Sequence, residues 1–211
     1  WHRSPCSSSG CWGMSVAIPD LLRLLSLNPV YRARVVHTDI TEPSEARYGE
    51  LRTPLSAALA GYIQQKNIRL YAHQCDAINH LRDGRNVIIT TPTASGKTLA
   101  FNLPGFEQLE RDPAARALYL FPPKALSNDQ LTTLEQMDRF TGISANPAIY
   151  DGDTPQSKRA AIRDNARIVI SNPHELHQVL SWHAKWRPLF SGLRYIVIDD
   201  AHRYRGVFGS H

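Results

Sequence analysis

The chain has 211 residues with a formal net charge of +5, and 42% of the residues are hydrophobic. This length suits one well-buried domain with an appendage and is short for two full domains. No apolar run approaches the roughly 18–20 residues of a membrane span, and three scattered cysteines exclude a disulfide framework, so we expect a cytoplasmic protein whose mildly basic surface suits a polyanionic partner.

The first 53 residues differ from the rest of the chain. Residues 1–13 are rich in Ser, Gly and Cys without any periodicity, which predicts a disordered leader. Residues 14–53 form a predicted N-terminal extension, in which Pro19 and the leucines after it indicate a short amphipathic helix. Residues 34–37 predict a short strand. We therefore assign the main domain to residues 54–211.

From residue 54 onward, short apolar strands alternate with helices. The predicted strands are residues 87–90, 117–121, 148–150, 167–170 and 194–198, and the predicted helices are residues 54–65, 73–81, 97–110, 127–139, 155–163 and 174–181. This alternation is typical of an α/β domain with a mostly parallel sheet and helices on both faces. Ligands of such sheets bind beyond the carboxyl ends of the strands, so we expect the functional residues directly after each strand.

A phosphate-binding loop is predicted after the first strand, where residues 91–98 read TPTASGKT and lead into a helix. Backbone N–H groups and the dipole of that helix favour a phosphate at this point. Gly96 lets the backbone approach the phosphate, Lys97 reaches the outer phosphates, and the Thr98 hydroxyl can hold Mg²⁺. Thr91 stands where the motif usually has its first Gly. The residues assigned to ATP in this loop are Thr93, Ala94, Ser95, Gly96, Lys97 and Thr98.

An acidic motif follows the last predicted strand, where residues 199–202 read DDAH. A nucleoside triphosphatase needs a carboxylate at the tip of a second strand to hold Mg²⁺, and we assign this role to Asp199. Asp200 is assigned to orient or deprotonate the attacking water, and His202 to carry a hydrogen bond to another surface. With Lys97, these are the candidate catalytic residues. Each alone also fits an ordinary polar residue at a strand end.

Further segments resemble motifs of the DEAH/DExH-box motors of helicase superfamily 2. They are LYAHQ at 70–74 for the Q motif, FPPKAL at 121–126 for motif Ia, YDGDTP at 150–155 for a glycine-containing turn, and SNPHELH at 171–177 for motif Ib. With YRGVFGSH at 204–211, the chain is similar to the YprA-like, Hrq-type branch, which is related to the RecQ helicases. The resemblance implies a RecA-like P-loop domain and ATP-dependent translocation on DNA with 3′-to-5′ polarity.

The resemblance also implies two sets of binding residues. Gln74 is expected to read the adenine edge of ATP, with Tyr71 lining the base pocket. The residues expected to hold the backbone of a single nucleic-acid strand, with DNA as the expected partner, are Lys124, Gly152, Ser171 and Asn172. A solvated helix start at Lys124 and a helix cap at Asn172 are the simpler alternatives.

Trp182 and Trp186 flank a basic stretch, HAK at 183–185, that continues into Arg187. Stacking of bases on these indoles is one interpretation. We expect both to be buried core aromatics instead.

The sequence departs from the family pattern at Asp200, where the family has Glu, and at Pro123, where Thr is usual. The shorter carboxylate at 200 puts ATP hydrolysis in doubt. The printed sequence also contains no second RecA-like domain. We therefore expect an ATP-dependent helicase fragment that is a weak ATPase alone. The alternatives are a module that binds ATP and nucleic acid without hydrolysis, and a translocase subunit that needs another catalytic domain.

Overall fold

The computed structural model of the protein describes residues 18–32, 34, 37, 46–90, 96–122 and 124–204, without the side chains of residues 18, 19, 124 and 125. The predicted leader and most of the predicted strand at 34–37 lie outside these residues. Contacts divide the chain into two units, residues 1–45 and residues 46–211, which are considered separately. No helix of the described residues is long and apolar enough to cross a membrane.

The first unit contains two short helices, α1 (Ile18–Leu27) and α2 (Pro29–Arg32). Helix α1 confirms the predicted amphipathic helix. Asn28 separates the two helices, and its side chain accepts a hydrogen bond of 2.9 Å from the N–H of Val30. This bond satisfies one of the free donors at the start of α2, which explains why a new helix begins here.

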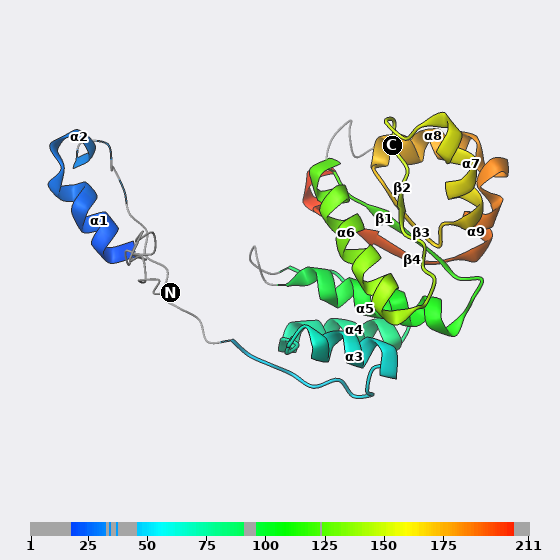
Figure 1. Ribbon diagram of the computed structural model, residues 1–211, viewed down its shortest axis with the longest axis horizontal. Helices are drawn as coiled ribbons and strands as arrows, with labels where there is room; N and C mark the ends of the chain where they lie inside the picture. The colour runs from blue at the N-terminus through cyan, green and yellow to red at the C-terminus, as the bar shows by residue number, and fades with distance from the viewer. Residues whose placement is uncertain are drawn as a thin grey trace, which may run out of the picture. The chain divides into compact units, whose positions relative to one another are not determined.

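The second unit is built on a parallel sheet of four strands (Figure 1). The strands are β1 (Arg116–Leu120), β2 (Ala148–Ile149), β3 (Ile168–Ser171) and β4 (Leu193–Ile198). Their order in the sheet is β2-β3-β1-β4, and every pair is parallel. This confirms the predicted α/β class. The carboxyl ends of all four strands consequently lie along one edge of the sheet.

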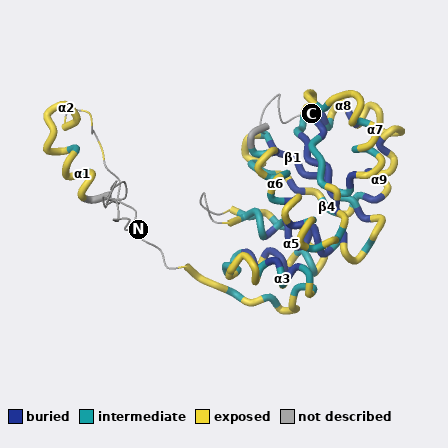
Figure 2. The backbone as a smooth tube through the Cα atoms, in the orientation of Figure 1, coloured by how far each residue is buried: buried dark blue, intermediate teal, exposed yellow. Residues whose placement is uncertain are grey.

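Helices cover both faces of this sheet, as predicted (Figure 1). The helices are α3 (Ala57–Gln65), α4 (Ala72–Arg82), α5 (Lys97–Arg111), α6 (Lys124–Thr141), α7 (Gln156–Asn165), α8 (Pro173–Ser181) and α9 (Arg187–Gly192), with short 3₁₀ helices η1 (His183–Trp186) and η2 (Ala201–Arg203). Tyr119 of β1 packs with α3 to α6, and its neighbours Leu118 and Leu120 pack against the opposite layer. The central strand β1 is therefore buried on both sides (Figure 2).

The predicted strand at residues 87–90 is wrong. This segment has no strand pairing, and the side chain of Ile88 is 90% exposed. Strand β4 forms one edge of the described sheet, and its residues Ile196 and Ile198 are each more than half exposed. An apolar, β-branched run favours an extended backbone. A strand also needs a neighbouring strand to pair with, and the local sequence does not reveal that neighbour.

Candidate nucleotide and nucleic acid site

Gly96 forms the junction between the phosphate loop and helix α5. It adopts a left-handed conformation, with φ 74° and ψ 28°, directly before the first helical residue, Lys97. A Cβ atom at this position would lie 2.6 Å from Nε2 of Gln74. Both the dihedral angle and the close contact require glycine. Thr93, Ala94 and Ser95 lie outside the described residues, so their contact with phosphate stays a prediction.

Lys97 and Asp199 come together although they are far apart in the sequence. Asp199 follows β4 and donates its backbone N–H to the carbonyl of Leu120, at 3.0 Å, at the carboxyl end of β1. Burial raises the pKa of the Asp199 carboxyl, and the nearby positive charge of Lys97 opposes this shift. Lys97 is therefore close enough to act on the carboxylate, at the edge of the sheet where ligands of parallel sheets bind.

Asp200 is one of the few non-glycine residues with a positive φ, at 48°. Its carbonyl accepts a hydrogen bond of 2.8 Å from the N–H of Arg203, which closes the short helix η2. The neighbouring Tyr204 has a pKa raised to about 12, through burial and then through the negative charges of Asp199 and Asp200. His202 lies exposed on η2. The acidic motif thus forms a turn, with Asp200 in a left-handed conformation followed by η2.

The predicted donors for Mg²⁺ are the Thr98 hydroxyl, in the first turn of α5, and the Asp199 carboxylate. Among the described residues there is no cluster of three or more His, Cys, Asp or Glu side chains that could hold a metal ion by itself. Mg²⁺ commonly takes one or two protein oxygens and completes its octahedron with phosphate oxygens and water. Thr98 and Asp199 fit that chemistry, because both offer hard oxygen ligands.

Gln74 connects the Q motif to the phosphate loop. Its side-chain oxygen accepts a hydrogen bond of 2.8 Å from the N–H of Tyr71, and its Nε2 donates one of 2.6 Å to the carbonyl of Gly96. The residue is only 1% exposed. An amide has two N–H donors and two acceptor lone pairs, so one of each remains. Reading of adenine by Gln74 stays a prediction, and it would use these remaining groups.

Tyr71 belongs to a column of stacked rings beside Gln74. Its ring lies 5.4 Å from that of Tyr48 and 5.7 Å from that of His73, nearly parallel to both. The guanidinium of Arg69 covers the Tyr48 ring at 4.1 Å. Sequence analysis missed Tyr48, which lies in the predicted N-terminal extension, and Arg69, which directly precedes the Q motif. The structure shows how close the two segments are, because a Cβ at Gly49 would lie 2.9 Å from the backbone of Ala72.

A buried ion pair fixes the helix of the Q motif to the helix of the phosphate loop. Arg82 of α4 donates to both carboxylate oxygens of Glu107 of α5, at 3.0 and 2.6 Å. The two side chains are 11% and 6% exposed. A bidentate pair of this kind is geometrically specific. It therefore fixes the spacing between Gln74 and Gly96.

The turn after β2 is held by hydrogen bonds between Asp151 and Thr154 and by one arginine. Arg159 of α7 donates to the carbonyls of Asp151, at 2.9 Å, and Thr154, at 3.0 Å. Its guanidinium also lies 4.9 Å from the centre of the Tyr150 ring and 3.4 Å from the buried carboxylate of Glu175 in α8. Gly152, at the tip of this turn, is exposed. Arg159 thus joins the turn to the start of α8, and sequence analysis missed it.

The residues predicted to hold a nucleic acid have different environments. Ser171 is buried, and its hydroxyl donates a hydrogen bond of 2.7 Å to the carbonyl of Tyr150, so this proton is already used inside the protein. The Asn172 side-chain oxygen accepts from the N–H of Glu175 at 2.9 Å, which confirms the helix-cap interpretation. The side-chain amide of Asn172 is free for another role. Helix α6 begins at Lys124, whose side chain is outside the described part.

Comparison with known proteins gives a consistent result. The family model for DEAD/DEAH box helicases matches residues 71–211. The uncharacterized ATP-dependent helicase YprA of Bacillus subtilis is 42% identical over 84% of this chain and 24% of the relative. The ATP-dependent helicase HRQ1 of Saccharomyces cerevisiae is 37% identical over 92% of this chain and 18% of the relative. The resemblance to the YprA-like, Hrq-type branch is thereby confirmed, and this chain spans less than a quarter of each relative.

Solved structures agree with this comparison. The crystal structure of the DUF1998 helicase MrfA bound to DNA and AMPPNP matches with a TM-score of 0.77 and 43% identity, over 81% of this chain and 24% of that one. The helicase Lhr of Mycobacterium smegmatis, bound to single-stranded DNA and AMP-PNP, matches with a TM-score of 0.57 and 27% identity, over 71% of this chain and 20% of that one.

Proposed function

Because the chain belongs to the DEAD/DEAH box helicase family, we propose that its second unit is the ATP-binding motor domain of an ATP-dependent DNA helicase. The observation that carries this proposal is the electrostatic interaction of Lys97, at the start of α5, with Asp199, whose backbone N–H binds the carboxyl end of β1. A magnesium triphosphate requires such a cation from a phosphate loop and a carboxylate from a second strand.

Each residue of this edge has a proposed role in hydrolysis. Lys97 neutralises charge on the outer phosphates, and the first N–H groups of α5 bind phosphate oxygens. Mg²⁺, held by Thr98 and Asp199, would offset the charge that develops on the phosphate oxygens. Asp200 orients a water for attack on the terminal phosphorus, which breaks the bond to the bridging oxygen and yields ADP and phosphate. His202 carries a hydrogen bond from this site towards the surface of η2.

The nucleic acid is proposed to bind along the same edge. Gly152, Asn172 and Lys124 follow β2, β3 and β1, and these strands are adjacent in the order β2-β3-β1. The next strand is β4, which leads to Asp199. A single strand across these ends would lie beside the triphosphate. Backbone contacts of this kind carry affinity without sequence information. The crystal structure of MrfA bound to DNA and AMPPNP supports the same combination.

Translocation requires a second RecA-like domain in this proposal. The chain covers only 18–24% of its curated relatives, so most of their length is additional. An arginine supplied from a partner domain is worth about 10³–10⁵ in rate in related phosphoryl-transfer systems. We expect the 211-residue chain to bind ATP and to hydrolyse it slowly.

A second candidate function is a module that binds ATP and nucleic acid without hydrolysing ATP. The observation that favours it is Asp200, whose short carboxylate stands on a left-handed backbone. A displacement of about 1 Å can cost on the order of a hundredfold in rate. A full-length protein that binds Mg-ATP but has no DNA-stimulated ATPase would match this candidate.

Calorimetric titration with Mg-ATP tests the phosphate site. The unsubstituted chain is expected to bind, and Lys97→Ala is expected to abolish detectable binding. Lys66→Ala is the matched control, because Lys66 is an exposed lysine at the end of α3. Unchanged affinity in Lys97→Ala would contradict the assignment of the phosphate loop.

A further inference from the structure

A pocket lies outside the site described above, at the far end of helix α8. It has a volume of about 430 Å³ and is lined by Leu180, His183, Ala184, Arg187, Phe190 and Ser191. We call it the Trp182 pocket, because Trp182, which does not line it, lies in the sequence between the lining residues Leu180 and His183. Pockets that hold small ligands measure roughly 300–1,000 Å³ and are mostly apolar with a few polar groups. This pocket is therefore large enough for one planar ring.

The two tryptophans of this region have different environments. Trp186 is buried at 3% exposure and meets the Tyr150 ring edge-on at 4.5 Å, which confirms its predicted place in the core. The same prediction is wrong for Trp182, whose side chain is 60% exposed. The ammonium of Lys185 lies 4.3 Å from the centre of the Trp182 ring. The Trp182 ring is not buried in the core, and one lysine covers it. The ring is therefore available for a ligand.

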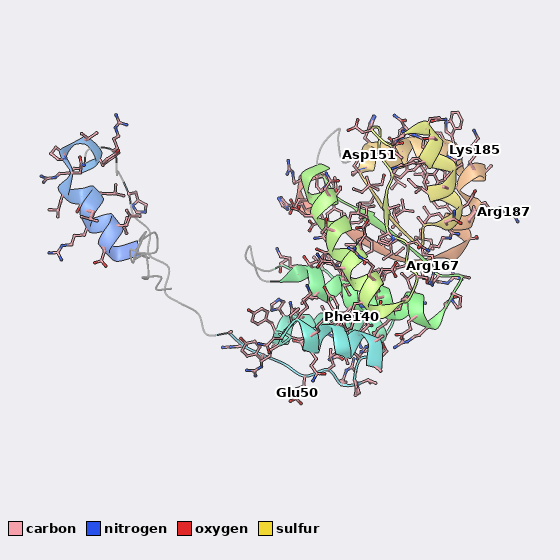
Figure 3. The ribbon with its side chains drawn as sticks, in the orientation of Figure 1. Glu50, Phe140, Asp151, Arg167, Lys185 and Arg187 are labelled. Atoms are coloured by element: carbon pink, nitrogen blue, oxygen red, sulfur yellow. The ribbon has the colours of Figure 1, made fainter. Side chains whose placement is uncertain are left out.

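The segment that carries Trp182 is basic in its charged residues, although Arg194 at its end is paired with Asp112 at 3.8 Å. The sequence from Leu176 to Ile198 contains no Asp or Glu, and it contains Lys185, Arg187 and Arg194. In the part of the chain that the structure describes, neither His183 nor Arg187 is paired with an acidic side chain. Figure 3 shows Lys185 and Arg187 at the outer margin of the domain. The positive charge is consequently open to a polyanion.

We propose that the Trp182 pocket is a second binding site for single-stranded nucleic acid. A base stacks on the open face of Trp182 or enters the apolar pocket next to it, and the adjoining phosphates bind Lys185 and Arg187. Aromatic side chains interspersed with cations are the combination that binds single strands without sequence preference. This inference rests on the proposed function, and it adds a site that the motifs at the sheet edge do not include.

The position of the pocket suits a strand that leaves the sheet edge. Asn172 caps the first end of α8 and Trp182 caps the last. The nine residues of that helix rise about 1.5 Å each, so the two ends lie about 13 Å apart. A strand that passes Asn172 can therefore follow α8 and reach Trp182 within a few nucleotides.

Fluorescence anisotropy with a labelled single-stranded oligothymidine of about 20 nucleotides, longer than the roughly 4–16 nucleotides that one binding domain covers, tests the site. The 211-residue chain is used without nucleotide. Trp182→Ala is expected to weaken binding by about tenfold, which is the loss of one stacked base, and Trp182→Phe is expected to retain most of the affinity. Because Trp182 is exposed, neither change should impair folding.

The charges are tested by the salt dependence of the same binding. Each cation that neutralises a phosphate of a single strand contributes about 0.7 to the slope of log affinity against log salt concentration. The double variant with Lys185→Ala and Arg187→Ala should therefore lower the slope by about 1.4. Lys66→Ala, on the opposite layer, should leave it unchanged.

Two outcomes would overturn the second site. One is equal affinity and equal salt slope in all variants, which would leave the pocket to another class of ligand. The other is the absence of binding by the unsubstituted chain. Both are distinguishable from failure of the proposed function, because the motor assignment is read from Mg-ATP binding in the Lys97 experiment and needs no oligonucleotide.

Discussion

The side-chain amide of Gln74 donates a hydrogen bond of 2.6 Å to the carbonyl oxygen of Gly96. This bond joins the Q motif to the last residue of the phosphate loop, across 22 positions of sequence. It also fills the space that a side chain at residue 96 would need. The bond therefore links the predicted adenine side of the candidate ATP site to its phosphate side.

Gly96→Ala is expected to destabilise the chain and to abolish Mg-ATP binding. The left-handed backbone costs an alanine about 1–2 kcal/mol, and the Cβ would meet Gln74 at 2.6 Å. Gly84→Ala is a matched control, because Gly84 has φ +75° and open space around its Cβ. Urea unfolding should give a larger loss for Gly96→Ala than for Gly84→Ala, and only the former should lose nucleotide. Equal losses would show that Gln74 moves away freely.

Glu107→Ala is expected to destabilise the chain by about 3–5 kcal/mol, since it leaves the buried guanidinium of Arg82 without its carboxylate partner and with only backbone carbonyls as acceptors. Replacement of both residues together, Arg82→Met with Glu107→Leu, should recover a large part of that loss, because no buried charge remains. Asp83→Ala is the control at an exposed ion pair, where little change is expected. The measurement is the urea midpoint. A small effect of Glu107→Ala alone would mean that water reaches Arg82.

Much of the fold could be predicted from the sequence because its signals are local. The continuous apolar run at residues 117–121 indicates a strand buried on both faces, and β1 is such a strand. The same apolar signal failed for residues 87–90, since pairing depends on a neighbour that is distant in sequence. Helix α9 was missed because it contains only the six residues Arg187–Gly192, which is too short for a helical period to be read.

Some residues of the candidate site could likewise be predicted from local sequence, and others could not. Gly96, Lys97 and Thr98 are consecutive, so their shared function is visible in the sequence. Tyr48 and Arg159 are not, because the first acts through a stack with Tyr71 and the second through carbonyls of a turn. Backbone carbonyls have no residue identity, so a side chain that binds them leaves no pattern.

Asp199→Asn is expected to stabilise the nucleotide-free chain at neutral pH while it abolishes binding of Mg-ATP. Burial raises the pKa of this carboxyl, so the native state binds its proton more tightly than the unfolded state. Stability is therefore lost as the pH rises from about 3.9, the ordinary value for Asp, through the raised pKa of the folded state. An asparagine at residue 199 does not ionise, so the variant does not lose this stability as the pH rises.

Thermal midpoints measured across this range test the prediction about Asp199. The advantage of Asp199→Asn should vanish at acidic pH and grow as the pH rises towards neutrality. Asp129→Asn, on an exposed part of α6, serves as the control. An advantage that is the same at every pH would contradict the explanation by burial of charge.

Arg159→Lys is expected to weaken binding of single-stranded DNA several-fold, although it keeps the positive charge. A lysine cannot reproduce a planar fork that reaches the carbonyls of Asp151 and Thr154 together. Hydrogen exchange at residues 151–154 should accelerate in the variant, because the turn loses its anchor. Arg163→Lys, in the last turn of the same helix, is the control. Unchanged exchange in Arg159→Lys would show that the turn holds itself.

Asp200→Glu is expected to raise DNA-stimulated ATPase in a protein that includes the second motor domain, and to lower thermal stability slightly. The extra methylene moves the carboxylate by about 1 Å, a distance that can change rate on the order of a hundredfold. The stability cost arises because residue 200 has φ 48°, a conformation that Asp and Asn adopt more readily than longer side chains. Asp200→Asn separates the two effects: it should retain stability and lose ATPase, because the amide keeps the backbone preference without the base. If Asp200→Glu has no higher ATPase although it binds Mg-ATP normally, the limiting group for hydrolysis lies elsewhere, and the interpretation of Asp200 as the residue that orients water is wrong.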